Sequence, residues 1–223
     1  MIELKDGAIF IADSHYNKNR TELYDVLSKF LTKKHIQIFL MGDIFDFLSY
    51  DSKYFISINQ DLINLLNRLS QIHQIIYLEG NHDFNLTNLF PDIIVIKRSS
   101  QPFILKSKSQ TISLAHGDIF TPFGYEVFTY ILRSFIFLKF INFIDIKNFI
   151  SKYVEKKLIK KYICRKQDGF EKFIQKRIKY YKTDLVIEGH FHQGYMSNKY
   201  INIPSFACSG KYLIYQDKKF SVI

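Results

Sequence analysis

Cysteine is scarce in this sequence. Only Cys164 and Cys208 occur among 223 residues, and neither stands in a CxxC pair. Two cysteines are too few for a disulfide framework, which favours a reducing compartment. The first residues, Met1 to Asp6, also lack the arrangement of a signal peptide. We therefore expect a cytoplasmic protein.

Acidic residues are few in one long stretch. From Lys147 to Lys182 the sequence has thirteen Lys or Arg residues and three acids, so this segment carries the whole net charge of +10. A concentrated basic patch predicts phosphate, an anionic membrane or nucleic acid as a partner. A solvated helix face in a lysine-rich composition is the plainer explanation.

An uninterrupted apolar run long enough to span a membrane is also missing. Residues 119–150 contain eight phenylalanines, but Arg133, Lys139, Asp145 and Lys147 interrupt every window of about 20 residues. Each charge would cost roughly 2.5–3.5 kcal/mol near the bilayer centre, so a span is not expected. An apolar stretch followed by a basic one suits an interfacial surface or a groove for acyl chains, unless it only packs on the core.

What the first half contains is a regular alternation of strand and helix patterns. Apolar runs at 7–12, 36–41 and 75–79 predict buried strands. The patterns at 20–33 and 54–72 predict amphipathic helices. This β-α-β-α-β order indicates right-handed crossovers and a largely parallel core.

The second half changes style near residue 90. Short strand patterns there are followed by a long helical insertion at 119–182, and the chain ends in strands again. We predict an α/β protein in which two sheets pack together with helices outside. Residues 1–118 and 183–223 would form the core, and residues 119–182 an inserted helical cap. The later strands are predicted at 93–96, 103–105, 111–115, 185–187, 200–203, 212–215 and 220–223.

Five of the predicted strands run directly into residue types that bind metals. The five loops hold five of the seven histidines, and only His35 and His73 lie elsewhere. Sites in α/β sheets are built from loops at the carboxyl ends of strands, so we expect these loops to meet. They are Asp13-Ser14-His15, Gly42-Asp43, Gly80-Asn81-His82-Asp83, His116-Gly117-Asp118 and Gly189-His190-Phe191-His192.

The ligand types in these loops indicate the chemistry. Imidazole, carboxylate and amide ligands without thiolates suit Mn²⁺ first, with Fe²⁺ or Zn²⁺ as alternatives. The loops offer more ligands than one ion needs, so we expect two ions bridged by a carboxylate and separated by roughly 3.5–4 Å. Such a pair supplies a nucleophile at neutral pH and neutralises charge on a phosphoryl group. The sequence therefore predicts phosphoester hydrolysis.

In their order, the five motifs resemble the signature of the calcineurin-like metallophosphoesterases. The resemblance runs from residue 13 to residue 192 and implies a four-layer αββα sandwich. His82 is similar to the family's loop histidine near the leaving-group oxygen, with Asp83 as the group that orients it. Asp46 and Asp118 are candidates for supporting roles. The implied ligands are Asp13, His15, Asp43 and His192 for one ion, and Asp43, Asn81, His116 and His190 for the other.

Within the family, the layout resembles UDP-2,3-diacylglucosamine diphosphatase of lipid A biosynthesis. That subfamily has a helical cap before its last motif and works at the inner membrane, where it releases UMP and an acylated sugar phosphate. The chain departs from it at His82, where the subfamily has arginine. The resemblance implies that the cap binds acyl chains and phosphates and contacts the inner membrane peripherally. The implied substrate-binding residues are Tyr125, Phe128, Phe135, Lys156, Lys160 and Lys161.

Other functions remain open at this point. A nucleotide or nucleic-acid phosphodiesterase of the same family would also use a basic cap, although phenylalanines clustered in apolar runs are not typical stacking platforms. A non-catalytic metal-binding scaffold is the alternative from another class, and the complete ligand set argues against it. Nucleic acid is therefore a less favoured partner than an acylated nucleotide sugar.

Overall fold

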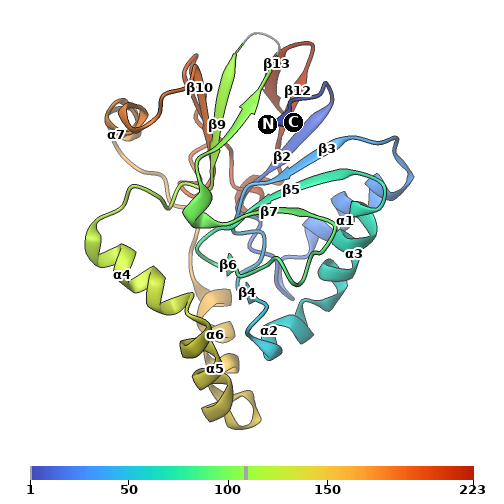
Figure 1. Ribbon diagram of the computed structural model, residues 1–223, viewed down its shortest axis with the longest axis vertical. Helices are drawn as coiled ribbons and strands as arrows, with labels where there is room; N and C mark the ends of the chain where they lie inside the picture. Colours follow the sequence, from blue (N-terminus) through green and yellow to red (C-terminus); the bar gives the residue numbers. More distant parts are fainter. Residues whose placement is uncertain (1, 108–109) are drawn as a thin grey trace.

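The computed structural model describes residues 2–107 and 110–223, and two sheets form its centre (Figure 1). Met1 and residues 108–109, which belong to the predicted core, lie outside the described residues. One sheet has five strands in the order β1-β8-β9-β10-β11, and the other has six in the order β13-β12-β2-β3-β5-β7. The strands are β1 (Ile2–Glu3), β2 (Ala8–Ile11), β3 (Gln37–Leu40), β4 (Leu48–Ser49), β5 (Gln74–Leu78), β6 (Asp83–Phe84), β7 (Ile94–Ile96), β8 (Phe103–Lys106), β9 (Thr111–Ala115), β10 (Leu185–Glu188), β11 (Tyr200–Asn202), β12 (Leu213–Gln216) and β13 (Lys219–Val222).

Helices cover the outside of both sheets and also extend beyond them. Short 3₁₀ turns continue or link several of these helices. The helices are α1 (Glu22–Ser28), α2 (Lys53–Ile58), α3 (Gln60–Ser70), α4 (Phe123–Leu132), α5 (Phe135–Ile144), α6 (Phe149–Lys160), α7 (Phe170–Arg177) and α8 (Phe206–Ser209).

The central strands are apolar throughout because both of their faces are covered. In β2, Ile9 and Ile11 join a cluster with the leucines of α1 and α3, while Ala8 and Phe10 join a cluster shared with the other sheet. Successive strand residues point to opposite faces, so burial on both sides requires an unbroken apolar run. The ring of Phe10 stacks on Phe39 of β3 with centroids 4.4 Å apart.

The outer layers complete the sandwich. α1 and α3 pack against the six-stranded sheet. On the other side, Phe170 and Ile174 of α7 pack with Val186 and Tyr200 of the five-stranded sheet. The order helix, sheet, sheet, helix confirms the predicted αββα fold.

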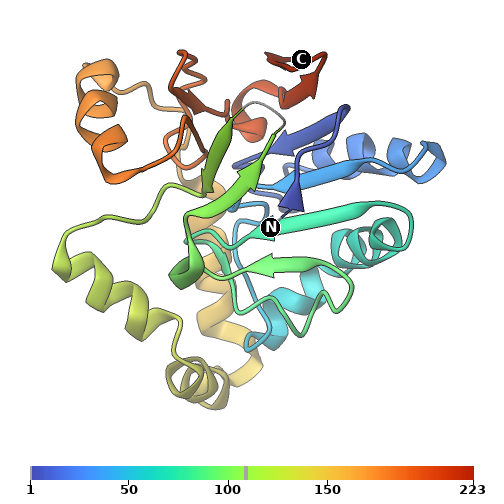
Figure 2. The same cartoon turned by 45° about the horizontal axis from the view of Figure 1, so that its top comes forward.

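The predicted cap divides into two parts. We call α4, α5 and α6 the cap helices, because all three lie beyond the edge of the sheets in Figure 1, and α4 and α5 again stand apart from the sheets in Figure 2. α7 instead belongs to the outer layer of the sandwich, although the sequence groups it with the cap. Among the described residues no single helix is long and apolar enough to cross a membrane, whereas α4 and α5 together, bent by 55°, meet that criterion by length and composition.

The cysteines do not match the expectation drawn from their number. Cys164, which follows α6, and Cys208 of α8 form a disulfide across 44 residues of sequence. No cysteine spacing in the sequence predicts this disulfide, because the two residues come together only in the tertiary fold. Cysteine usage therefore no longer supports a reducing compartment.

Candidate metal centre

The five predicted loops meet at one edge of the sandwich. β2, β3 and β5 are mutually parallel in one sheet, and β9 and β10 are parallel in the other. Their carboxyl ends therefore deliver the motif residues to a common edge, where sites in α/β sheets are found.

A first group of ligand types joins the loops after β2 and β10. One ligand atom from each of Asp13, His15 and His192 lies within 4.8 Å of the other two. Nε2 of His192 is 3.4 Å from a carboxylate oxygen of Asp13. The rings of His15 and His192 meet nearly edge to face, with centroids 5.4 Å apart.

A second group joins the loops after β3, β5, β9 and β10. Asp43, His116 and His190 offer ligand atoms within the same 4.8 Å limit. Nε2 of His116 is 3.5 Å from Oδ2 of Asp43 and 3.3 Å from Nδ1 of His190. Oδ1 of Asn81 is 3.2 Å from the same imidazole nitrogen.

Asp43 belongs to the second group and connects it to the first through His15. It also forms a third group with His15 and His82. A carboxylate that contacts ligands on both sides is the residue type that bridges paired ions. The structure therefore brings together all seven residues that the sequence predicts as ligands.

The residues fit a cation. His15 is almost completely buried, and among the described residues neither of its ring nitrogens has a hydrogen-bond partner. Nδ1 is 3.3 Å from Oδ1 of Asp46 but not in hydrogen-bond geometry. Because an unpartnered buried polar group is costly, an imidazole held this way among carboxylates suits a divalent metal ion.

The backbone at the ligands is strained. Asp13, His15, Asp43, His190 and His192 all have φ between 44° and 64°, in the left-handed region. Residues with side chains seldom adopt this conformation, and such strain clusters at functional sites. The sharp turns direct these side chains from the strand ends into one volume.

Glycines allow the loops to approach this closely. A Cβ atom on Gly42 would overlap the ring of His116, and one on Gly80 would overlap the carboxylate of Asp43. Gly42 also has φ of 85°. Only glycine permits both the conformation and the contact at this position.

Charge and burial set the protonation of the imidazoles. Burial lowers the pKa of His116, but the carboxylate of Asp43 more than offsets this and raises the pKa well above its usual range. Burial also lowers the pKa of His192, and Asp13 more than offsets it. Burial, helped by neighbouring His116, lowers the pKa of His190 to about 4. Burial likewise lowers the pKa of His15, although Asp46 acts in the opposite direction.

The structure corrects the role of Asp83. Its carboxylate does not orient His82 but accepts hydrogen bonds from the backbone of Asp43 at 2.9 Å and Ile44 at 2.6 Å, and from the hydroxyl of Tyr77 at 2.6 Å. Nδ1 of His82 instead lies 2.6 Å from the backbone oxygen of Asp46. His82 lies in the bend that precedes β6 and Asp83 is the first residue of β6, so the two side chains contact different parts of the loop of Asp43 and Asp46.

The two other acids near the motifs have supporting contacts. The carboxylate of Asp46 faces His15 and accepts hydrogen bonds from Asn17 at 2.5 Å and Arg20 at 3.2 Å. Asp118 is fully buried and accepts a hydrogen bond from Arg98 at 2.8 Å. These contacts hold the acids in place around the ligand groups.

A cavity of about 320 Å³ opens over the ligands. Its walls include His82, which places this imidazole beside the space a substrate would fill. Of the three predicted lysines, Lys161 lines this cavity, whereas Lys156 and Lys160 are exposed on α6. Arg165 and Lys166, which the sequence analysis did not single out, add two more cations to the wall.

The predicted aromatic contacts lie farther along the cap helices. Tyr125 and Phe128 are neighbours on α4, with ring centroids 6.3 Å apart. Phe135 lines a second cavity, of about 830 Å³, between α4, α5 and the core. None of the three is among the described residues that line the ligand cavity.

The contacts that the sequence analysis missed come from outside the motifs. Arg133, in the turn between α4 and α5, donates a 2.6 Å hydrogen bond to the carbonyl of Gly80. Ile163 presents its carbonyl to Nδ1 of His192 at 2.8 Å. Both lie in segments whose composition looks like an ordinary apolar or basic helix region, so no sequence signal marks them.

Together, these groups define the centre of a metal-dependent hydrolase. A family model described as Calcineurin-like phosphoesterase matches residues 8–194, which include every predicted ligand. The chain therefore belongs to the calcineurin-like phosphoesterase family. The prediction of a metal-dependent hydrolase is confirmed at this level.

Solved structures give weaker comparisons. An archaeal protein described as a novel phosphodiesterase is 12% identical with a TM-score of 0.46, and the match covers 97% of this chain and 98% of the other. A phosphoesterase from E. coli, Yfce, is 13% identical with a TM-score of 0.46, over 97% of this chain and 91% of the other. No curated protein matches the chain.

Proposed function

We propose that this phosphoesterase uses two divalent ions, with Mn²⁺ as the first candidate, to cleave the pyrophosphate link of an acylated nucleotide sugar. Asp13, His15 and His192 would hold one ion, and His116, His190 and Asn81 the other, with Asp43 shared. The observation that carries the metal assignment is the presence of two ligand groups that a third group, formed by His15, Asp43 and His82, connects. When bound, such ions supply a nucleophile at neutral pH and offset phosphoryl charge.

His82 has a separate role in this proposal. It lines the cavity over the ligands, and its Nδ1 is fixed by the carbonyl of Asp46. Nε2 is then the nitrogen that exchanges a proton with substrate, so His82 would protonate the leaving oxygen. Asp83 supports the site by fixing the backbone of Asp43 rather than by taking part in proton transfer.

The exposed surface of the cap helices favours a substrate that has both an apolar and a charged part. Phe123 and Phe143 have 83% and 85% of their surface exposed, and many neighbouring apolar side chains are exposed as well. Apolar patches of this kind mark sites for lipid or protein contact. The exposed apolar residues of the cap include Phe123, Phe128, Tyr130, Phe135, Ile136, Phe140, Phe143, Ile146 and Phe149.

Basic residues lie next to this apolar surface. Lys152, Lys156, Lys157 and Lys160 are exposed on α6, the third cap helix. Lysines near a membrane surface attract anionic lipid headgroups at about 1 kcal/mol each. We propose that the cap helices rest on the cytoplasmic face of the inner membrane, where an acylated substrate would be reached.

A nucleotide phosphodiesterase is the second candidate. Lys161, Arg165 and Lys166 line the ligand cavity, and three cations there would serve a nucleotide phosphodiester as well as a pyrophosphate. This function has no use for the exposed phenylalanines of the cap. The acylated substrate accounts for both features, so we prefer it.

The test compares three substrates at equal Mn²⁺ concentration: the diacylated nucleotide sugar, its deacylated analogue and single-stranded DNA. The proposal predicts a much larger kcat/KM for the acylated compound, since each buried methylene contributes about 0.8 kcal/mol. A comparable value for the deacylated compound would end the acyl-chain proposal. Faster cleavage of DNA would establish the phosphodiesterase candidate instead.

A further inference from the structure

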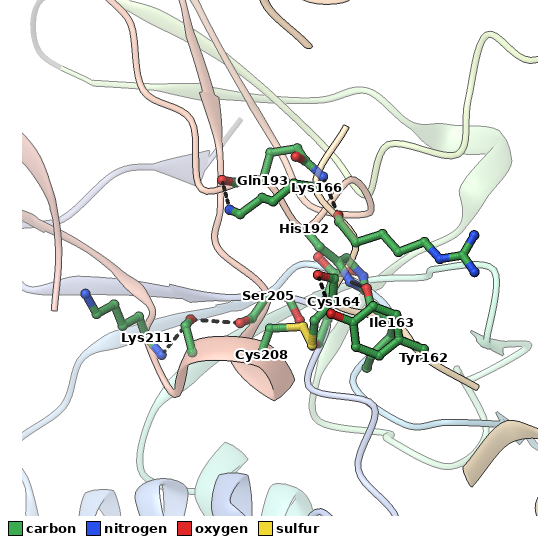
Figure 3. Close-up of a disulfide and its surroundings, with 12 residues drawn as sticks. Tyr162, Ile163, Cys164, Lys166, His192, Gln193, Ser205, Cys208 and Lys211 are labelled. Carbon is green, nitrogen blue, oxygen red and sulfur yellow. Dashed lines mark hydrogen bonds and ion pairs between the residues drawn. A yellow bond between two sulfur atoms is a disulfide. The ribbon is translucent and has the colours of Figure 1, made fainter. Parts of the chain in front are cut away.

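The disulfide lies beside a proposed metal ligand. Cys164 follows Ile163, whose carbonyl oxygen is 2.8 Å from Nδ1 of His192, and Cys208 lies in α8 (Figure 3). Metal-binding imidazoles usually donate the proton of their other nitrogen to such a carbonyl, which fixes the tautomer and the ring. The disulfide therefore anchors Cys164, and Cys164 adjoins Ile163, the residue that orients His192.

The carbonyl that orients His116 is held differently from the one that orients His192. Its Nδ1 is 2.8 Å from the carbonyl of Met41, which is completely buried at the end of β3. Ile163 instead belongs to residues 161–169, which form no regular helix or strand between α6 and α7. Most residues of that segment are exposed, so the core itself does not fix the carbonyl that His192 needs.

Other contacts of the segment are exposed hydrogen bonds. Gln193 accepts a 2.9 Å bond from Lys166 through its backbone oxygen and donates a 3.0 Å bond from its side chain to the carbonyl of Arg165. Exposed bonds of this type contribute little net stability because water competes for both partners. The covalent bond between Cys164 and Cys208 is the strong attachment.

Cys208, at the other end of the disulfide, lies in the helix that contacts Asp13, a proposed ligand of the same ion. At α8, the side chain of Ser205 and the backbone N–H of Ala207 donate hydrogen bonds to the carbonyl of Asp13, at 2.8 and 3.1 Å. The disulfide thus connects the element that holds Asp13 with the segment that orients His192. Both are proposed ligands of one ion, whereas the His116 group has no contact of this kind with α8 among the described residues.

We propose that the Cys164–Cys208 disulfide positions His192, and that its reduction selectively weakens the ion site formed by Asp13, His15 and His192. This inference rests on the metal assignment made above. Loss of an orienting partner typically lowers metal affinity 10–100-fold. The site around His116 keeps its own orienting carbonyl and is unaffected.

A dithiol reductant would break this disulfide. The S–S bond accepts two electrons and two protons and becomes two thiols, at Cys164 and Cys208, while the reductant becomes a disulfide. Cys208 is exposed and Cys164 is partly exposed, so a reductant can reach the bond. Disulfides of cytosolic proteins are usually transient or redox-sensing, in agreement with the proposed location.

The experiment titrates metal-free protein with Mn²⁺ and counts the bound ions by electron paramagnetic resonance of the free ion. It compares oxidised wild type, wild type reduced with a dithiol that is then removed under anaerobic conditions, and the double variant C164S/C208S. Tyr54→Phe is the matched control. It removes a 2.7 Å hydrogen bond from Tyr54 of α2 to Glu155 of α6, and so loosens the cap without touching the disulfide.

We expect oxidised wild type to bind two Mn²⁺ ions per chain. Tyr54→Phe should bind two ions with the same affinities. The reduced protein and C164S/C208S should retain one site and bind the second ion 10–100-fold more weakly. Reoxidation should restore the wild type and leave the double variant unchanged. Because the reduced wild type carries no substitution, this comparison does not depend on how well the variant folds.

Three results would overturn the inference, and they can be told apart. Equal affinities in all four proteins would mean that the disulfide has no part in metal binding. Equal weakening of both sites would show a general loosening rather than an effect on His192. Fewer than two sites in oxidised wild type would refute the proposed metal centre, and the inference with it.

Discussion

Nδ1 of His82 lies 2.6 Å from the backbone carbonyl oxygen of Asp46. The carboxylate of the same Asp46 faces the unpartnered imidazole of His15 at 3.3 Å. One residue therefore fixes the proposed proton donor and supports a proposed metal ligand. Proton transfer and metal binding therefore share Asp46 as a support, and substitutions at His82 and at the metal ligands test the two roles one at a time.

His82→Ala should slow hydrolysis of esters with poor leaving groups far more than that of activated esters. A general acid contributes typically 10²–10⁴-fold when the leaving oxygen needs a proton, and little when it does not. Rates on aryl phosphoesters of graded leaving-group pKa measure this. His35→Ala, at an exposed histidine outside the site, is the control and should change neither rate. Equal losses on both kinds of ester would remove His82 from this role.

Metal binding should release protons at neutral pH. The pKa of His116 is raised well above its usual range by the carboxylate of Asp43, so its ring favours the protonated form in the metal-free protein and a metal must displace that proton. The pKa of His192 is raised in the same direction. We expect roughly one to two protons per chain to be released. His190, with its pKa near 4, is already neutral at pH 7 and releases none.

The sign of the pH effect follows from these directions. A raised pKa favours the metal-free, protonated state at low pH, so Mn²⁺ affinity should rise as the pH rises towards the raised pKa values. Calorimetry in buffers of different ionisation enthalpy measures the release directly. Binding at pH 7 without proton release would contradict the ion pairing of His116 with Asp43.

Arg133→Met should destabilise the protein by roughly 3 kcal/mol, because removal of one partner leaves a buried charge uncompensated. Arg133 pairs with the buried carboxylate of Glu79 at 3.3 Å and binds the carbonyl of Gly80. Urea unfolding measures the loss. Adding Glu79→Gln should recover part of it, since the uncompensated charge is then gone. Strictly additive losses would show that the pair has no coupling.

Removing two exposed aromatics from the cap should weaken membrane attachment without affecting hydrolysis. We expect Phe123→Ser with Phe143→Ser to weaken binding to anionic vesicles at least about tenfold, since each side chain would bury apolar area worth about 1.5–3 kcal/mol. Cosedimentation measures this, and hydrolysis of a small soluble phosphoester should stay unchanged. Ile58→Ser, at another exposed apolar position, is the control. Unchanged vesicle binding would refute the proposed membrane contact.

The layered fold was predictable from the sequence because the central strands are buried on both faces. Runs such as 7–12 and 36–41 cannot be amphipathic, and each ends where a ligand loop begins. The ligand residues themselves were visible because histidines and aspartates follow those runs in order. Two-residue strands such as β4 and β6 carry no periodic signal, so they were not predicted.

Contacts that depend on direction or on distant segments were not visible. Asp83 follows His82, yet its carboxylate binds the backbone of Asp43 and Ile44 rather than the imidazole. Cys164 and Cys208 meet only because α8 packs beneath Asp13 while the segment after α6 returns to His192. Neither relationship follows from spacing along the chain.

The most direct test of the metal centre is anomalous diffraction from crystals soaked in Mn²⁺. We predict two peaks separated by roughly 3.5–4 Å, one on each side of the Asp43 carboxylate. Asp43→Ala, which removes the shared ligand, should lose at least one peak together with hydrolytic activity. A single peak in the wild type, or two peaks away from Asp43, would contradict the account.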